Sequence, residues 1–258
     1  MVQEDHAQED VAKFIGAASL EESAPAHPKA IITQVIKEDP EMVHISNFVS
    51  QEEAEHLLHL AEGRWIRSTV TRGLASELLG EKCDVSHEEG VEAEQRPQAS
   101  QEVFSERNTS SHVRLGYGES VVVERILARV ATVTGYPLEN VEKLVMVRYM
   151  PGETFMLHHD GAHRPKTVFV YLNDVSDGGE TTFPYLGLKV RPKMGTAMMW
   201  QNNVPRSDEI GEAIADRRMD HEAVPPADGC IKYGMNAFVS ERPQRDCSNI
   251  RIVKQGGA

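Results

Sequence analysis

The chain has 258 residues, 40% of them hydrophobic, and carries a formal net charge of −13 at pH 7. That length suits one domain with tails, and the hydrophobic fraction is sufficient for a sizeable core. The acidic balance argues against a general nucleic-acid or anionic-membrane binder, and no apolar run is long enough to span a bilayer.

The N-terminal part combines a polar tail, two strands and a helix. Residues 1–30 predict a flexible tail, because their second half is rich in Ala, Ser, Glu and Pro. Alternating and β-branched residues predict strands over 31–36 and 42–48. A helix follows from Ser50, which can form a capping box with Glu53. The apolar residues of this helix share one face: Ala54, Leu57, Leu58 and Ala61.

An acidic segment at residues 77–107 interrupts the alternation of strands and helices. It contains Gly and Pro and almost no large apolar residues, so we expect an exposed loop or insertion. The folded domain is expected over residues 31–245, with this loop inside it and a C-terminal tail at 246–258.

The cysteine content bears on the cellular compartment. Three cysteines at irregular spacing suit neither a disulfide framework nor a zinc module: Cys83, Cys230 and Cys247. The start of the chain also lacks the basic and apolar pattern of a secretory signal. A reducing, cytoplasmic location is therefore favoured.

The second half of the chain begins with a helix and continues with short strands. Apolar spacing predicts a helix over 120–134, ended by Gly135 and Pro137, and then a short helix at 137–142. Residues 201–220 predict a polar loop. Strands are expected at 144–149, 167–172, 188–190, 196–200 and 233–239. Helices followed by a run of short strands predict an α+β fold with an antiparallel double-sheet core.

His158 and Asp160 lie one residue apart in the segment after the 144–149 strand. In a strand their side chains would project from the same face, whereas His159 would point away. An imidazole and a carboxylate side by side supply two cis ligands for a divalent metal. With His221 as the third ligand they would form the 2-His-1-carboxylate triad that leaves positions open on Fe(II). The next basic residue, Lys232, could hold an acidic co-substrate near the open face.

The residues around this pair form a series of motifs. They are Tyr149-x-x-Gly152-x-x-Phe155-x-x-His158-x-Asp160, Arg164-x-x-Thr167-x-x-x-Tyr171-Leu172-Asn173, Gly178-Gly179-Glu180-Thr181-x-Phe183-Pro184, and Asp216-x-x-x-x-His221 followed by Pro225, Gly229 and Lys232. Over about residues 142–239 the series resembles the Fe(II)/2-oxoglutarate dioxygenases, and within them the prolyl 4-hydroxylase family. One departure is that two residues separate Gly229 from Lys232, where the family usually has one.

The resemblance implies a double-stranded β-helix, or jelly roll, with N-terminal supporting helices and the metal between its two sheets. It implies Fe(II), 2-oxoglutarate, O2 and L-ascorbate as cofactors, with His158, Asp160 and His221 as metal ligands. Lys232 and Tyr171 are then expected to bind the far carboxylate of 2-oxoglutarate.

Three further residues receive roles from the resemblance. Thr167 and Tyr149 are candidates for the co-substrate pocket, although both also suit packing inside the sheet. Arg164 matches the arginine that orients the substrate near the iron, and is the catalytic candidate; a turn residue beside Pro165 is the alternative. In the family, the region corresponding to residues 77–107 forms a mobile lid over the peptide substrate, so the resemblance makes a lid the alternative to a solvated loop without a chemical role.

The expected function is therefore formation of 4-hydroxyproline in a peptide or protein, with release of succinate and CO2. One alternative keeps the cofactors but acts on a free amino acid or another small molecule. Another is a catalytically silent metal- or peptide-binding module. A zinc hydrolase also uses two histidines and an aspartate, but it needs a general base, and no motif supports the nearby Glu153 or Glu180 in that role.

Overall fold

The structure is a computed structural model that describes residues 29–71, 102–104, 107–204 and 213–246. The expected tails and the acidic segment lie almost entirely outside these ranges, so they stay predictions. No helix in the described part of the chain is long and apolar enough to cross a membrane.

Two α-helices and three short 3-10 helices accompany the strands in these ranges. The helices are α2 (Gln51–Ala61), α4 (Val121–Thr134), η1 (Leu138–Asn140), η2 (Pro184–Leu186) and η3 (Arg217–Met219). The strands are β1 (Ile32–Lys37), β2 (Met42–Ser46), β3 (Ile66–Arg67), β4 (Thr69–Thr71), β5 (Glu102–Phe104), β6 (Ser111–Leu115), β7 (Leu144–Tyr149), β8 (Phe155–His158), β9 (Lys166–Tyr171), β10 (Thr181–Phe183), β11 (Leu188–Val190), β12 (Ala197–Gln201), β13 (His221–Ala223) and β14 (Lys232–Val239).

The two long helices begin and end as their sequences predict. The Ser50 hydroxyl accepts the N–H of Glu53 at 3.2 Å, and the Glu53 carboxylate accepts the N–H of Ser50 at 3.0 Å, which completes the capping box of α2. Helix α4 ends at Gly135, whose φ of 73° lets its N–H bond the carbonyl of Ala131.

Other local predictions differ from the structure. The helix predicted over residues 137–142 is too long. Val141 is already extended and forms a β-bridge with Val239, so only the 3-10 helix η1 is present. The 201–220 loop contains η3, which is capped by the Asp216 carboxylate. The sequence pattern also misses β6, which pairs with β7 along its whole length.

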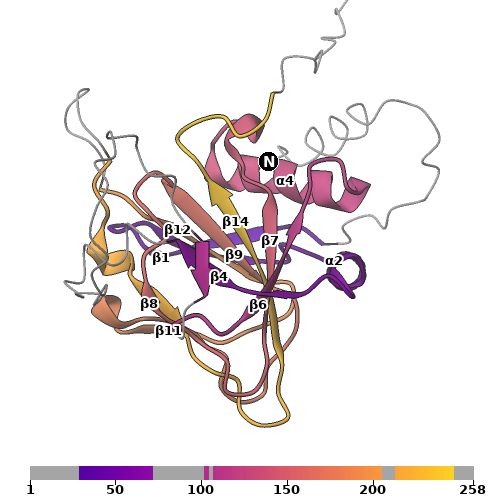
Figure 1. Cartoon of the computed structure of the whole chain (residues 1–258). Helices are drawn as coiled ribbons and strands as arrows, with labels where there is room; N and C mark the ends of the chain where they lie inside the picture. The colour runs from indigo at the N-terminus through magenta and orange to yellow at the C-terminus, as the bar shows by residue number, and fades with distance from the viewer. Residues whose placement is uncertain (1–28, 72–101, 105–106, 205–212, 247–258) are drawn as a thin grey trace, which may run out of the picture.

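The strands form two sheets of antiparallel pairs, with a separate ribbon of β4 and β5 (Figure 1). The larger sheet has the order β1-β2-β12-β9-β14-β7-β6-β3, and the smaller has the order β11-β10-β13-β8. Neighbouring strands such as β2 and β12 come from distant parts of the chain. The expected α+β double-stranded β-helix is confirmed, and α2 and α4 are its supporting helices.

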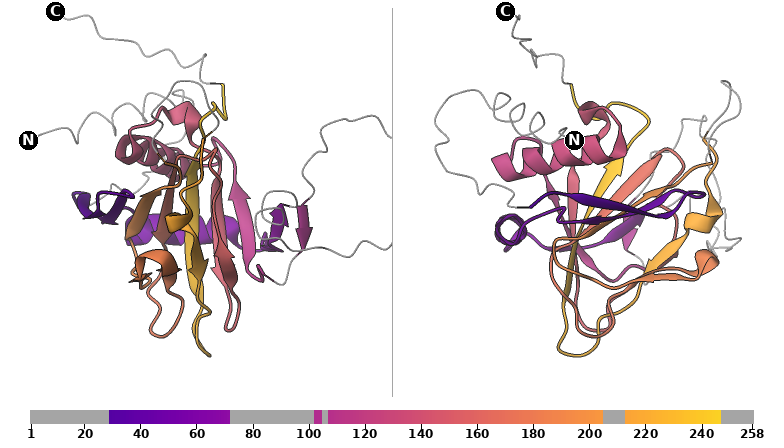
Figure 2. Two further views of the ribbon diagram at one scale, coloured as in Figure 1. Left: turned by 90° about the vertical axis from the view of Figure 1, so that its left-hand side faces the viewer. Right: turned by 180° about the vertical axis from the view of Figure 1, so that it is seen from behind.

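Alternate residues of the large sheet build two separate cores. On β9, Val168 and Val170 pack with the residues of α2 and α4, whereas Phe169 and Tyr171 pack with small-sheet residues such as Phe183. Figure 2 shows the helices and the small sheet on opposite sides of the large sheet. Because both faces of β9 are covered, its residues from Val168 to Tyr171 form a continuous apolar and aromatic run. The candidate site lies in the core between the two sheets.

Candidate metal centre

Two histidines face each other across the small sheet. Strands β8 and β13 pair antiparallel with His221 opposite His158, and the centroids of the two rings are 4.3 Å apart. The strand expected to carry both His158 and Asp160 ends at His158, so Asp160 lies in the turn that leads to β9. Its carboxylate is held there by β9, because the Thr167 hydroxyl donates a hydrogen bond of 2.7 Å to Asp160 Oδ2.

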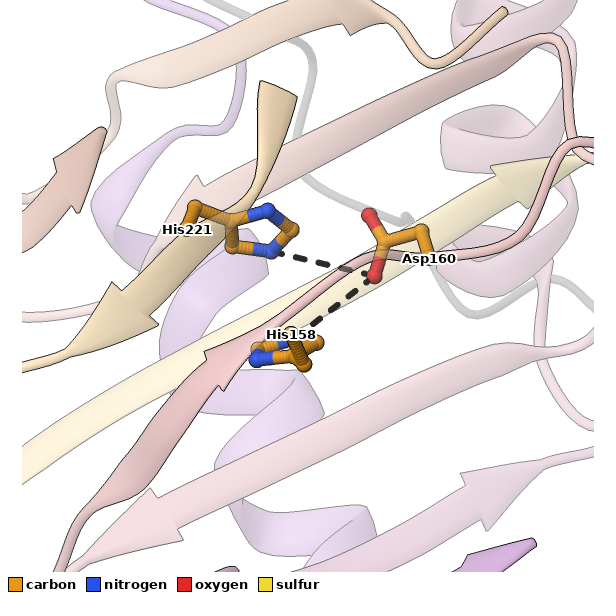
Figure 3. Close-up of side chains that lie close together, drawn as sticks. All are labelled: His158, Asp160 and His221. Carbon is orange, nitrogen blue, oxygen red and sulfur yellow. Dashed lines mark ion pairs between the residues drawn. The ribbon is translucent and has the colours of Figure 1, made fainter. Parts of the chain in front are cut away.

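The other carboxylate oxygen of Asp160 faces both imidazoles. Oδ1 is 3.8 Å from His158 Nε2 and 3.7 Å from His221 Nε2, as Figure 3 shows. One ligand atom from each of the three residues lies within 4.8 Å of the others. Two nitrogens and one oxygen around a common point match the donor set of a facial 2-His-1-carboxylate site.

Both histidines present the same ring nitrogen to this point. His158 Nδ1 lies 2.8 Å from the carbonyl of Met156, and His221 Nδ1 lies 2.9 Å from the carbonyl of Met219. A carbonyl only accepts, so each Nδ1 carries a proton, and it is Nε2 that holds the lone pair when the ring is neutral. Such a second hydrogen bond is what orients histidines that bind metals, so these side chains fit a divalent ion.

The protonation states also suit a metal. Burial, and then the charge of His221, lower the pKa of His158 to about 3, so its ring is neutral at pH 7. Burial acts to raise the pKa of Asp160, but His221, His158 and the Thr167 hydrogen bond outweigh it and hold that pKa below its usual value. His158 therefore offers a neutral imidazole and Asp160 an ionised carboxylate to a metal ion.

Aromatic rings enclose the two histidines. Phe155 stacks on His158 with ring centroids 3.5 Å apart, and Trp200 meets His221 edge-on at 4.9 Å. Phe183 lies 5.4 Å from His221. These contacts limit ring rotation and keep water from this side of the site.

His159 is occupied elsewhere. Its Nδ1 accepts the N–H of Gly161 at 2.9 Å, and its Nε2 lies 2.9 Å from the carbonyl of Asn202. Both ring nitrogens thus bond backbone groups, and the structure brings His158 and not His159 to Asp160 and His221.

Lys232 lies at the start of β14 and is fully buried. Its ammonium is 3.3 Å from Thr181 Oγ1, and Tyr171 donates to the same oxygen at 3.0 Å. The ammonium also lies 5.2 Å from the ring centroids of Tyr149 and Phe169. Within the described ranges no carboxylate lies at ion-pair distance from it, which is unusual for a buried lysine and indicates a place for an anion.

Two predicted residues contact protein groups instead of an open pocket. Thr167 bonds Asp160, as described above. Arg164 pairs with Glu142 through contacts of 2.8 and 2.9 Å and lies 4.0 Å from the ring centroid of Phe238. Its Nη1 also donates to the carbonyl of Asp160 at 3.3 Å. The substrate-orienting role of Arg164 stays a prediction, as does the co-substrate role of Thr167.

Two residues that lie in the site, Thr181 and Asn202, have no role predicted from the sequence. Thr181 joins Lys232 to Tyr171, and its signal was its place in the Gly-Gly-Glu-Thr motif. Asn202 bonds Thr167 at 2.8 Å and is fully buried. It stands in the expected polar loop, where no local pattern distinguishes it from a solvated residue.

Comparison with known proteins identifies the family. The sequence model of the 2OG-Fe(II) oxygenase superfamily matches residues 144–240, which include every metal-centre residue described above. This segment of the chain belongs to the superfamily, and the two curated relatives described next are prolyl 4-hydroxylases. Among curated relatives, prolyl 4-hydroxylase 5 of Arabidopsis thaliana is 30% identical in an alignment that covers 72% of the present chain. Probable prolyl 4-hydroxylase 11 of the same plant is 32% identical in an alignment that covers 67% of the present chain.

Solved structures agree on the fold. The viral collagen prolyl hydroxylase of Paramecium Bursaria Chlorella virus-1, in complex with 2OG, superposes with a TM-score of 0.53 at 21% identity, covering 77% of this oxygenase and 94% of the viral chain. The chain spans 58% and 60% of the lengths of the two plant relatives.

Proposed function

We propose that this chain is an Fe(II)- and 2-oxoglutarate-dependent dioxygenase that forms 4-hydroxyproline in a peptide or protein. The observation that carries the proposal is that the triad of His158, Asp160 and His221 and the buried ammonium of Lys232, which has no carboxylate partner among the described residues, lie in the same core. Phe183 and Trp200 beside His221 belong to the same cluster as the rings of Phe169 and Tyr171 beside Lys232.

Lys232, Tyr171 and Thr181 would bind the far carboxylate of 2-oxoglutarate. Lys232 supplies the charge, and the two hydroxyls supply further hydrogen bonds at the same point. A charge-assisted contact of this kind contributes roughly 1.5–3 kcal/mol to the free energy of binding. Because the site is dry, the contact is also more specific for its ligand than an ion pair at the surface would be. Despite the departure before it, Lys232 opens β14 opposite Tyr149, which supports its role.

His158, Asp160 and His221 would hold Fe(II) and leave its remaining positions for 2-oxoglutarate and O2. Bound Fe(II) would activate O2, the oxidant: one oxygen atom would enter succinate as 2-oxoglutarate loses CO2, and the other would enter a substrate C–H bond as a hydroxyl group. The aromatic residues around the histidines exclude water, which strengthens the electrostatic contacts inside.

The prolyl substrate is supported by the two plant relatives and the viral enzyme, which are named as prolyl hydroxylases. A free amino acid or another small molecule is the competing substrate class. L-ascorbate is proposed as an assisting reductant because this family usually uses one.

The test incubates the protein with Fe(II), 2-oxoglutarate and a panel of proline-containing peptides. Succinate formation and a mass gain of one oxygen atom per peptide should rise in step. Succinate formed without a change in any peptide would move the substrate to a small molecule. Failure to bind Fe(II) or 2-oxoglutarate would contradict the enzyme class itself.

A further inference from the structure

Building on the proposed function, we infer that Asn202 is a positioning residue that makes Asp160 bind the metal through one oxygen only. Asn202 follows β12 directly, and its side chain is fully buried. None of its hydrogen bonds to the described residues reaches the three candidate metal ligands or Lys232 directly. Its influence passes through Thr167 and through the turn that carries Asp160.

The orientation of the Asn202 amide follows from partners whose roles are fixed. Trp200 Nε1–H can only donate, and it reaches Asn202 Oδ1 at 2.8 Å. The carbonyl of Arg164 can only accept, and it receives Nδ2–H at 2.9 Å. The second Nδ2–H therefore points at Thr167 Oγ1, 2.8 Å away.

This amide sets the direction of the Thr167 hydroxyl. Because the Oγ1 of Thr167 accepts from Asn202, its one proton is available to Asp160 Oδ2, at 2.7 Å. An oxygen engaged in this way is a poor second metal ligand, and Oδ1 is left facing both histidines. A carboxylate that binds through one oxygen leaves one more coordination position open for small ligands.

The backbone of Asn202 also holds the turn between His158 and β9. Its carbonyl accepts from His159 Nε2 at 2.9 Å, and its N–H donates to the carbonyl of Pro165 at 2.9 Å. The turn is thus bonded to Asn202 on both sides of Asp160. The indole that bonds Asn202 Oδ1 is also the ring that meets His221 edge-on, so Asp160 and His221 both contact a hydrogen-bond partner of Asn202.

The test measures Mn(II) affinity by the electron paramagnetic resonance of unbound Mn(II), in the absence of 2-oxoglutarate. Asn202→Asp keeps the size and the acceptor for Trp200 but replaces the donor to Thr167 with an acceptor, which draws the hydroxyl proton away from Asp160. The dissociation constant should rise about 10–100-fold. Thr167→Val should give a similar loss, and Thr167→Ser should restore nearly full affinity.

Two controls separate positioning from general destabilisation. Thr134→Val also removes a buried hydroxyl, which bonds the Val130 carbonyl in α4, and should leave Mn(II) affinity unchanged. The double variant of Asn202→Asp and Thr167→Val should lose little more than either single variant, because both act through the same hydrogen bond.

A folded Asn202→Asp protein with wild-type Mn(II) affinity would overturn the inference, as would fully additive losses in the double variant. If that substitution prevents folding, equal affinities for Thr167→Val and Thr167→Ser would overturn it. A wild-type protein that binds no Mn(II) would instead contradict the proposed metal centre.

Discussion

The buried ammonium of Lys232 lies 3.3 Å from the hydroxyl oxygen of Thr181, although the two residues belong to different sheets. The contact joins β14 of the large sheet to β10 of the small sheet. A neutral hydroxyl offsets little of the cost of burying a charge. The ammonium is therefore better satisfied when a carboxylate binds beside it.

Replacing Lys232 with methionine should separate co-substrate binding from folding. We expect Lys232→Met to raise KM for 2-oxoglutarate about 10- to 150-fold, which is the loss of roughly 1.5–3 kcal/mol. The ligand-free protein should unfold at higher urea concentration, because a buried charge has been removed. Steady-state kinetics and urea titration measure the two effects.

The control for this variant is Lys189→Met, at an exposed position of β11. It should change neither quantity. An unchanged KM in Lys232→Met would assign the co-substrate carboxylate to another cation.

The binding of 2-oxoglutarate should weaken above neutral pH. Burial lowers the pKa of Lys232 to about 7, and Glu180 offsets only part of this shift. The folded pKa lies below the unfolded one, so the ligand-free protein gains stability as pH rises from about 7 towards 10.5. Anion binding needs the protonated lysine, so KM for 2-oxoglutarate should rise by up to about tenfold per pH unit above 7.

Kinetics from about pH 6 to pH 9 would measure this dependence. Lys232→Arg should reduce it, because a guanidinium stays charged over the whole range. A KM in the wild-type protein that is flat with pH would show that Lys232 is charged before the co-substrate arrives.

Removing the carboxylate ligand should abolish coupled turnover. Asp160→Ala takes away the only anionic ligand and leaves two neutral imidazoles, so Fe(II) affinity should fall by at least about 100-fold. Titration of Fe(II) under anaerobic conditions measures this loss. Asp228→Ala, at an exposed position before β14, is the matched control and should bind and turn over normally. Peptide hydroxylation that survives in Asp160→Ala would contradict the triad.

The Glu53 carboxylate should be important for stability and not for chemistry. It is 1% exposed, closes the capping box of α2 and pairs with Arg129 at 2.9 Å. Glu53→Ala would leave a largely buried guanidinium without this partner, and we expect a loss of about 3–5 kcal/mol in the free energy of unfolding.

Urea unfolding of the metal-free protein measures this loss. Glu52→Ala, in the same helical turn but exposed, should cost well under half as much. Equal losses in the two variants would mean that the capping box and the ion pair contribute nothing specific.

Much of the architecture was predictable from local patterns. The capping box of Ser50 and Glu53 and the αL residue Gly135 mark helix ends through contacts within a few residues. Strand β7 was found with its exact bounds, because its branched and apolar residues have a strand pattern. Strand β6 was missed because its polar residues take their conformation from pairing with β7, a distant segment.

For the metal centre, the residue types and their order can be read from the chain, because His158, Asp160, His221 and Lys232 stand in a recognisable series of motifs. How these side chains meet depends on the arrangement of the strands in the folded protein. Pairing of β8 with β13 sets the two histidines opposite each other, and Thr167 and Asn202 hold the carboxylate that lies beyond the strand. The physical reason is that these hydrogen bonds join segments far apart in the chain, and no local periodicity records such contacts.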